Sequence, residues 1–223
     1  MYLENTLIME ASSAHPVRIL IVDDHPVMCS GLSNLLGMYE GILVIGSAGS
    51  GAEALMVIPR ERPDLVLLDL RMPGIDGISV IQQLRKSPDS PKVIVLTSYA
   101  QDELIYQAIK AGAWGYLLKD TSAEEIIKAI SSVQAGKHYI PVDISSRLAE
   151  RMRRTDLTPR ELQTLELLAE GHTNKEIATA LKLSDYTVRH YVNNIMEKLH
   201  APDRTGAVAT AFRSGLLQRL DRS

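Results

Sequence analysis

Residues able to do chemistry stand where short apolar runs of this chain end. They are three carboxylates, a hydroxyl and an ammonium: Asp23, Asp24, Asp69, Thr97 and Lys119. The run before Asp69, Leu65–Leu68, is apolar throughout, which predicts the interior of a buried strand. Open parallel sheets place their chemistry at the carboxyl ends of their strands. The five side chains are therefore predicted to share one edge of one sheet.

Such a group could hold a divalent cation and an anion together. The adjacent carboxylates of Asp23 and Asp24 repel each other unless a cation lies between them. With Asp69 they form an oxygen-rich site suited to Mg²⁺. Asp69 would then be free to attack a phosphoryl group as a nucleophile, while Lys119 pairs with phosphoryl oxygens and Thr97 donates a hydrogen bond. Any one of these residues alone could equally be an ordinary polar residue where a loop begins, but together they favour phosphoryl chemistry.

Alternating strand-like and helix-like stretches between Val17 and Gly136 would position these side chains. The predicted strands are Val17–Val22, Leu43–Ala48, Leu65–Asp69, Lys92–Thr97 and Gly115–Lys119. The predicted helices are Pro26–Met38, Gly51–Arg60, Gly77–Lys86, Asp102–Ala111 and Ser122–Ala135. Five βα units in this order predict an α/β fold, a five-stranded doubly wound parallel sheet with helices on both faces.

A small all-α domain of four helices is predicted after this region. Thr158–Pro159–Arg160–Glu161 marks the start of its first helix, with a cap, a first-turn proline and a capping box. Further helices are predicted at Asn174–Leu181, Asp185–His200 and Arg204–Ser214. We therefore expect four parts: a flexible N-terminal tail (1–16), the α/β domain (17–136), a partly helical linker (137–155) and the helical domain (156–220).

Composition argues against several classes of protein. The chain has 223 residues, of which 45% are hydrophobic, and this is ample for a packed core. No segment reaches the roughly 20 apolar residues of a membrane span, and Met1–His15 does not resemble a secretory signal. The lone Cys29 suits a reducing cytoplasm better than a disulfide framework. We expect a cytoplasmic protein without a membrane partner.

Charge is distributed unevenly along the chain. The total of −3 is made up of −2 over residues 1–16, −4 over 17–136, +3 over 137–155 and 0 over 156–223. Overall acidity therefore does not exclude nucleic-acid binding, although any such surface must be local. The basic linker could hold the two domains together, because it faces an acidic α/β domain, or could touch a DNA backbone.

The helical domain has the form of a helix-turn-helix. A short helix is followed by a turn at Leu183–Ser184 and by a longer helix. The apolar stripe of the longer helix leaves Arg189, His190 and Asn193 facing outward, where they could reach base edges in a major groove. Candidate phosphate contacts are Thr173, Lys175, Thr187, Lys198, Arg204 and Thr205. Each lone cation could instead belong to a solvated helix face.

The α/β region contains four motifs: V-D-D-H-P, L-L-D-L-R-M-P-G-I-D-G, V-L-T-S-Y and A-W-G-Y-L-L-K-D. In these motifs it resembles the receiver domain of two-component response regulators. The resemblance implies that Asp69 accepts a phosphoryl group from a sensor histidine kinase. It implies that Mg²⁺ is held by three carboxylates and one backbone carbonyl, those of Asp23, Asp24, Asp69 and Arg71. It also implies a switch that senses the phosphoryl group, made of Thr97, Tyr116 and Lys119.

Two positions of the receiver motifs that tune such sites are bulky here. They are Arg71, two residues after the predicted phospho-acceptor, and Tyr99, two residues after the predicted sensing threonine. We expect these side chains to restrict the access of water and to lengthen the lifetime of the phosphoryl group.

The helical domain closely resembles the LuxR-type helix-turn-helix over Leu157–Leu217, in the pattern L-T-P-R-E-L…G-H-T-N-K-E-I-A…L-K-L-S…T-V-R…N-N-I-M-E-K-L. A receiver followed by this module is the arrangement of the NarL/FixJ class of response regulators. The resemblance implies a transcriptional regulator that binds double-stranded DNA, forms a homodimer when phosphorylated and has RNA polymerase as a further candidate partner. It also implies no enzyme activity beyond slow self-dephosphorylation.

The chain departs from the LuxR-type pattern at two places. Tyr191 stands where the family usually has His, and it could contact a phosphate or simply pack. His200 and Pro202 stand where a small and apolar pair is common. The target sequence of the family therefore cannot be carried over to this chain.

Two other interpretations stay open from the sequence. In the first, the regulator works without phosphorylation and the receiver is a platform for dimerisation or ligand sensing. In the second, the chain is a phosphatase-type enzyme. A haloacid-dehalogenase-type phosphatase wants a second acid two residues after its aspartyl nucleophile, and this chain has Arg71 there. The complete acidic pocket argues against the first interpretation, and Arg71 argues against the second.

Overall fold

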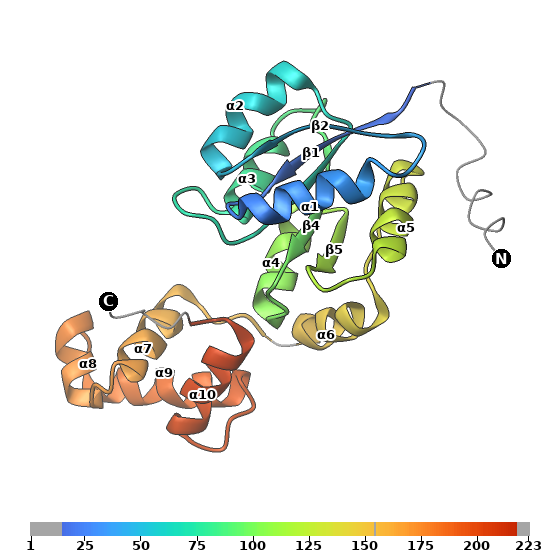
Figure 1. Cartoon of the computed structure of the whole chain (residues 1–223). Coiled ribbons are helices and arrows are strands. Elements are labelled where there is room, and N and C mark those ends of the chain that lie inside the picture. The colour runs from blue at the N-terminus through green and yellow to red at the C-terminus, as the bar shows by residue number, and fades with distance from the viewer. Residues whose placement is uncertain (1–14, 154, 218–223) are drawn as a thin grey trace. The chain divides into compact units, whose positions relative to one another are not determined.

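The computed structural model describes residues 15–153 and 155–217 of the chain (Figure 1). The chain forms two compact units. One contains the described residues up to Ala100 together with Ile105–Ser145, and the other contains Gln101–Leu104 together with the described residues from Ser146 onward. Almost all of the predicted N-terminal tail, and the last residues of the predicted helical domain, lie outside the described part. No helix in the described ranges is long and apolar enough to cross a membrane.

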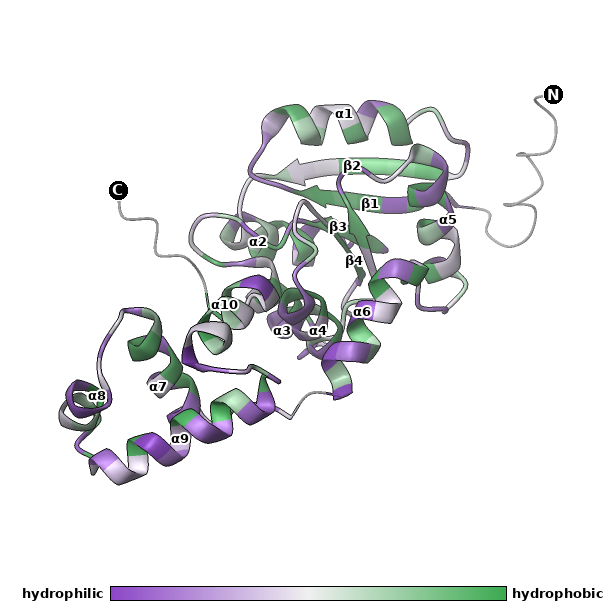
Figure 2. Cartoon of the chain, turned by 90° about the horizontal axis from the view of Figure 1, so that it is seen from below, coloured by the Kyte–Doolittle hydropathy of each residue, from purple (hydrophilic) through white to green (hydrophobic). Residues whose placement is uncertain are grey.

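A five-stranded parallel sheet forms the centre of the first unit, in the order β2-β1-β3-β4-β5. The strands are β1 (Val17–Val22), β2 (Ile42–Ala48), β3 (Leu65–Leu68), β4 (Lys92–Thr97) and β5 (Gly115–Leu118). Every residue of β3 is buried, as its apolar run predicts for a strand covered on both faces. The strands are accordingly among the most hydrophobic segments of the chain (Figure 2).

Helices cover both faces of this sheet. They are α1 (Pro26–Leu36), α2 (Gly51–Glu61), α3 (Gly77–Leu84), α4 (Asp102–Ala111) and α5 (Ala123–Gln134). The path across the sheet reverses after β2, so right-handed crossovers place α1 on the face opposite to α2, α3 and α4. One buried cluster contains side chains from α1, α5 and the strands, so α5 shares the face of α1. The predicted doubly wound α/β fold is confirmed.

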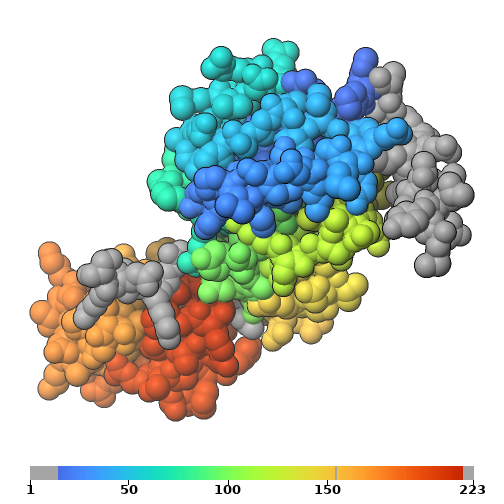
Figure 3. All heavy atoms as spheres, viewed as in Figure 1, coloured from blue at the N-terminus to red at the C-terminus, as the bar shows by residue number. Residues whose placement is uncertain are grey.

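The outer surface of the first unit is built from these helices and their loops. In the space-filling view the blue atoms of α1 lie beside lighter blue atoms of the segment that follows it, with α2 in cyan above and α5 in yellow-green below (Figure 3). Cys29 of α1 is buried in the cluster beneath, where burial raises the pKa of its thiol. The thiol is therefore part of the core.

The second unit is built from helices and their loops in the residues that the structure describes. After α6 (Val142–Arg153), which begins in the first unit, come α7 (Pro159–Ala169), α8 (Asn174–Leu181), α9 (Asp185–Lys198) and α10 (Arg204–Ser214). A separate apolar cluster joins α7, α8, α9 and α10 around fully buried residues, including Leu165, Ile177 and Ile195. The predicted all-α domain of four helices is confirmed, and α8 and α9 are the two helices of its helix-turn-helix.

Caps fix the helix starts in the second unit. Thr158 and Glu161 form the predicted capping box of α7. Thr173 and Glu176 form a second box at α8, which the spacing S/T-x-x-E would also have indicated. Ser184 caps α9, because its hydroxyl accepts a hydrogen bond from the Thr187 N–H at 3.0 Å.

Two arginines of the predicted basic linker make ion pairs within the second unit. Arg151 is only 5% exposed, and it donates hydrogen bonds to Glu103 at 2.6 Å and to Asp156 at 2.7 Å. Arg147 donates to Asp102 at 2.9 Å. Two of the five basic side chains of the linker are therefore committed to carboxylates.

Candidate functional site

Backbone hydrogen bonds carry the sheet pairing one residue past the strand ends. The Asp69 N–H donates to the Val22 carbonyl, and the Lys119 N–H donates to the Thr97 carbonyl, both at 2.9 Å. Each polar residue is thereby fixed against the neighbouring strand at the carboxyl edge of the sheet. This edge lies at the point where the strand order reverses, which is where open α/β sheets form their binding crevice.

Lys119 lies between two buried carboxylates. Its Nζ is 2.7 Å from Oδ2 of Asp23 and 2.6 Å from Oδ2 of Asp69, and both carboxylate side chains are 4% exposed. Burial of the Lys119 ammonium opposes its charge, but the hydrogen bonds to Asp23 and Asp69 outweigh this and raise the pKa of Lys119 above its ordinary value. The ammonium therefore stays charged at neutral pH and balances part of the negative charge around it.

Asp24 supplies the third carboxylate of the pocket. Its Oδ1 is buried and has no hydrogen-bond partner among the described residues, although it lies 3.0 Å from Nδ1 of His25. Asp23, Asp24, His25 and Asp69 each offer one ligand atom, and these atoms lie within 4.8 Å of one another. An unsatisfied buried carboxylate oxygen beside two others fits a hard cation such as Mg²⁺, which takes oxygen ligands.

His25 was not among the predicted site residues. Its Nδ1 lies 3.1 Å from Oδ1 of Asp23 and 3.0 Å from Oδ1 of Asp24, while its side chain is 70% exposed. The only signal in the sequence is its place directly after the two aspartates. It borders the pocket from the solvent side.

The other predicted sensing residues, Thr97 and Tyr116, belong to strands β4 and β5. Thr97 is fully buried, and its hydroxyl has no hydrogen-bond partner within the described part of the chain. Tyr116 is also fully buried, and its hydroxyl donates to the backbone carbonyl of Tyr99 at 2.6 Å. The ring of Tyr116 therefore lies inside the protein. Thr97 thus offers a free hydroxyl where an anion could accept a hydrogen bond.

Arg71 and Tyr99 contact each other next to the pocket. The Arg71 guanidinium lies 4.2 Å from the centroid of the Tyr99 ring, a cation–π distance. The Arg71 N–H also donates to Oδ1 of Asp69 at 3.3 Å. The two bulky side chains thus form one stack anchored beside the predicted phospho-acceptor.

One face of α9 carries the residues predicted to read DNA bases. Arg189, His190 and Asn193 are exposed, and Val188, Val192 and Ile195 form the buried stripe on the other side. Figure 2 shows this amphipathic pattern as alternating purple and green along α9. The Arg189 guanidinium pairs with Asp185 one turn earlier, which sequence reasoning missed although the i,i+4 spacing could have indicated it.

The predicted phosphate contacts fall into two groups. Exposed side chains are those of Thr173, Lys175 and Thr205. Half-buried side chains with partners inside the unit are those of Thr187, Lys198 and Arg204. Lys198 donates to buried Glu161 at 2.7 Å, and Arg204 donates to the His172 carbonyl at 2.8 Å. The second group is therefore already used in the packing of the helices.

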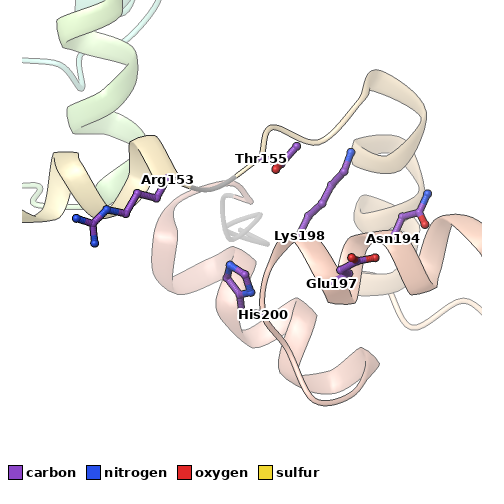
Figure 4. Close-up of a pocket in the computed structure, with 6 residues that line it drawn as sticks. All are labelled: Arg153, Thr155, Asn194, Glu197, Lys198 and His200. Atoms are coloured by element: carbon purple, nitrogen blue, oxygen red, sulfur yellow. The ribbon is translucent and has the colours of Figure 1, made fainter.

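Tyr191 packs rather than standing free. It is half-buried, and its ring lies 6.4 Å from that of His190 at a tilt of 38°. An open hollow of about 400 Å³ lies at the other end of α9, lined by Arg153, Thr155, Asn194, Glu197, Lys198 and His200 (Figure 4). Its lining is polar and charged, so it offers little apolar surface to a small organic molecule.

The fold and the pocket together define the class of this protein. The chain matches the family described as response regulator receiver domain over residues 19–131, and the family described as bacterial regulatory proteins, luxR family, over residues 155–211. The chain belongs to the two-component response regulators of the NarL/FixJ class, with a receiver and a LuxR-type DNA-binding domain. The family resemblance read from the motifs is confirmed.

Similar proteins support this assignment over most of the chain. The response regulator protein VraR of Staphylococcus aureus is 37% identical over 207 residues, which cover 91% of this chain and 99% of VraR. The response regulator RcsB of Salmonella typhimurium has a similar structure, with a TM-score of 0.71, 27% identity, and coverage of 86% of this chain and 98% of RcsB. A structure of two RcsB dimers bound to two parallel DNAs matches with a TM-score of 0.68, 27% identity, and coverage of 88% and 98%.

Proposed function

We propose that this chain is a transcriptional regulator switched by transfer of a phosphoryl group from a sensor histidine kinase to Asp69. The observation that carries the proposal is the buried pocket in which Asp23 and Asp69 share the Lys119 ammonium, with the unpaired Thr97 hydroxyl beside it. The LuxR-type domain on the same chain supplies an output for this input.

The residues that would hold Mg²⁺ are Asp23, Asp24, Asp69 and the backbone carbonyl of Arg71. When bound there, the cation would offset the negative charge of an incoming phosphoryl group. The unsatisfied Oδ1 of Asp24 supports this assignment, since a buried carboxylate oxygen without a partner costs free energy unless a cation or a donor completes it.

Asp69 acts in the proposed transfer as the nucleophile. One of its carboxylate oxygens forms a bond to phosphorus while the bond from phosphorus to the donor nitrogen of the kinase breaks, giving an acyl phosphate. Lys119, now 2.6 Å from Asp69, pairs with a phosphoryl oxygen as a point charge. Thr97 donates a hydrogen bond from its hydroxyl group to a second phosphoryl oxygen.

Tyr116 and Tyr99 link this event to the start of α4. The hydroxyl of Tyr116 holds the Tyr99 carbonyl at 2.6 Å, and Tyr99 is two residues from Thr97. A shift of Thr97 toward the phosphoryl group therefore displaces the backbone that Tyr116 holds. We propose that this rearrangement favours a homodimer, since two recognition helices on two half-sites bind DNA more tightly than one.

The remaining assignments complete the proposal. The domains are a tail (1–16), a receiver (17–136), a linker (137–155) and a DNA-binding domain (156–220). The predicted DNA-contacting residues keep their roles, with Arg189, His190 and Asn193 at bases.

The protein works in the cytoplasm, where its proposed partners are the kinase, chromosomal DNA and RNA polymerase. Apart from slow self-dephosphorylation it is no enzyme, because Arg71 replaces the second acid that a phosphatase would need.

Phosphoryl transfer to Asp69 can be tested directly. The full chain is incubated with acetyl phosphate and Mg²⁺, and intact mass and peptide mapping follow. We expect one added phosphoryl group on Asp69 and none on Asp69→Asn. Asp89→Asn, which changes an exposed carboxylate outside the pocket, is the matched control and should label like wild type. Label on another residue, or steady turnover of acetyl phosphate without a labelled intermediate, would contradict the proposal.

A further inference from the structure

Tyr186 is a large aromatic side chain left in solvent. It is 83% exposed and is the second residue of α9. Single exposed apolar residues are common on protein surfaces, so exposure alone assigns no role. The position of Tyr186 on the helix is what distinguishes it.

The spacing of Tyr186 places it on the face that carries Arg189, His190 and Asn193. Positions 186, 189, 190 and 193 are related as i, i+3, i+4 and i+7, which share one side of a helix. All four residues are exposed. Tyr186 is therefore the N-terminal member of the exposed face of the recognition helix.

The fold of the second unit does not use the Tyr186 side chain. Ser184 caps α9 and bonds to both the N–H and the hydroxyl of Thr187, so the cap is complete without Tyr186. Aromatic residues lose rotamer freedom in helices, and a tyrosine contributes little to a helix start. Tyr191, the other tyrosine of α9, differs because it is half-buried against His190.

We infer that Tyr186 is a fourth base-reading residue, which packs its ring against the 5-methyl group of a thymine in the major groove. The inference deepens the proposed function and rests on it. The N-terminal residues of a recognition helix contact base edges in helix-turn-helix proteins. The thymine methyl is the apolar group presented in the major groove, and apolar side chains recognise it. A rigid, exposed ring at the second residue of α9 suits that contact.

The test removes the methyl group and the ring in turn. The full chain, with beryllofluoride and Mg²⁺ added, selects its binding site from a random-sequence duplex library. Each thymine of the selected site is then replaced by uracil, which lacks the 5-methyl group. For wild type we expect one position in each half-site where uracil weakens binding about fourfold, as for the loss of one buried methyl-sized group.

Variants of Tyr186 decide which part of the side chain acts. Tyr186→Ala should bind the thymine and uracil forms of that position equally, and Tyr186→Phe should discriminate like wild type. Met152→Ala removes another exposed apolar side chain, from α6, and should also behave like wild type. Tyr186→Ala should leave the packing of the domain undisturbed, because the side chain is exposed.

Three results would overturn the inference. They are a selected site without thymine, a Tyr186→Ala variant that still discriminates thymine from uracil, and a Tyr186→Phe variant that loses discrimination, which would assign the contact to the hydroxyl. A wild-type protein that selects no sequence at all would contradict the proposed DNA-binding function itself, and the inference with it.

Discussion

Lys119 carries the positive charge of the pocket to which the proposed phosphoryl group would be added. Its ammonium bonds to the carboxylates of Asp23 and Asp69, and these bonds raise its pKa despite the burial that opposes its charge. A lysine whose pKa is raised by folding stabilises the protein at all pH values below its unfolded pKa, and this contribution is lost only as pH rises through the higher folded pKa. At neutral pH the pocket therefore holds a permanent cation that a phosphoryl group can share.

The stack of Arg71 on Tyr99 is proposed to lengthen the lifetime of that phosphoryl group. Replacing both residues by alanine should open the approach of water to the proposed acyl phosphate on Asp69. We expect the dephosphorylation half-time to shorten about fivefold, because a stack of this kind is worth about 1 kcal/mol. The half-time is measured from the loss of phosphoryl label over time. Arg60→Ala, an exposed arginine elsewhere, should change nothing, and an unaltered half-time in the double variant would show that the stack does not guard the site.

Asp185 restrains the charge of Arg189 on the proposed DNA-reading helix. Asp185→Asn removes one negative charge and releases the Arg189 guanidinium from its ion pair. On a duplex without the base that Arg189 is proposed to read, the released guanidinium can pair with a phosphate instead. We expect tighter binding to a mixed-sequence duplex and a steeper salt dependence, by about one unit in the slope of log affinity against log salt. Fluorescence anisotropy over a salt series measures both. Glu166→Gln makes the same charge change at an exposed site on α7, and an equal effect there would argue against a specific role for Asp185.

At the scale of elements, His200, which departs from the family pattern, lies just past the end of α9. The Ala201 N–H donates to the Met196 carbonyl at 2.8 Å and the His200 N–H to the Glu197 carbonyl at 3.0 Å, which is a Schellman motif. It requires a left-handed residue, and His200 has a φ of 49°. The predicted helix ran on to His200, whereas α9 ends at Lys198 because this motif closes it.

Glycine at position 200 should relieve the strain of the left-handed backbone conformation that His200 adopts. His200→Gly is expected to stabilise the second unit by about 1 kcal/mol, the cost of a left-handed conformation for a residue with a Cβ atom. Thermal unfolding followed by circular dichroism measures the gain. His200→Ala keeps the Cβ atom and should give no increase. Equal stabilities for the glycine and alanine variants would mean that the backbone conformation is not the source of strain.

The ion pair of Glu161 with Lys198 braces α7 against α9. Burial of the Glu161 carboxylate opposes its charge, but hydrogen bonds from Lys198 and Thr158 outweigh this and lower the pKa of Glu161. Its contribution to stability is therefore present above the unfolded pKa of about 4.3 and is lost as pH falls toward the lower folded pKa.

Glu161→Gln tests this brace, because glutamine can still complete the capping box with Thr158. We expect the variant to lose about 1 to 2 kcal/mol at neutral pH, and to lose less further stability than wild type on acidification to about pH 3.5. Thermal unfolding at both pH values gives the comparison. A wild type and a variant with parallel pH profiles would exclude Glu161 as the titrating group.

Over the whole molecule, the sequence predicts what depends on local pattern. Apolar runs and turn residues located the strands and helices of the described residues to within a few residues, except α6, which was predicted only as part of a partly helical linker. The edge of a parallel sheet brought Asp23, Asp69 and Lys119 together. Contacts between residues far apart in the sequence could not be predicted from it. Nothing in local spacing links Glu161 to Lys198, which are 37 positions apart. The stack of Arg71 on Tyr99 was also missed as a contact, although both residues were singled out.

The proposed switch is a coupling between two sites on one chain. Phosphorylation can change DNA affinity only as far as the phosphorylated receiver favours the DNA-binding state, and such coupling is typically 1 to 3 kcal/mol. Beryllofluoride with Mg²⁺ mimics the phosphoryl group on the carboxylate of Asp69, so Asp69→Asn should abolish the coupling while leaving the LuxR-type domain intact.

The most direct test is the affinity of the full chain for its selected DNA site with and without beryllofluoride and Mg²⁺, for wild type and for Asp69→Asn. We predict that the treatment strengthens binding by wild type at least about fivefold, the low end of such coupling, and leaves binding by Asp69→Asn unchanged. Equal affinities for treated and untreated wild type, or an Asp69→Asn variant that responds fully, would contradict the account.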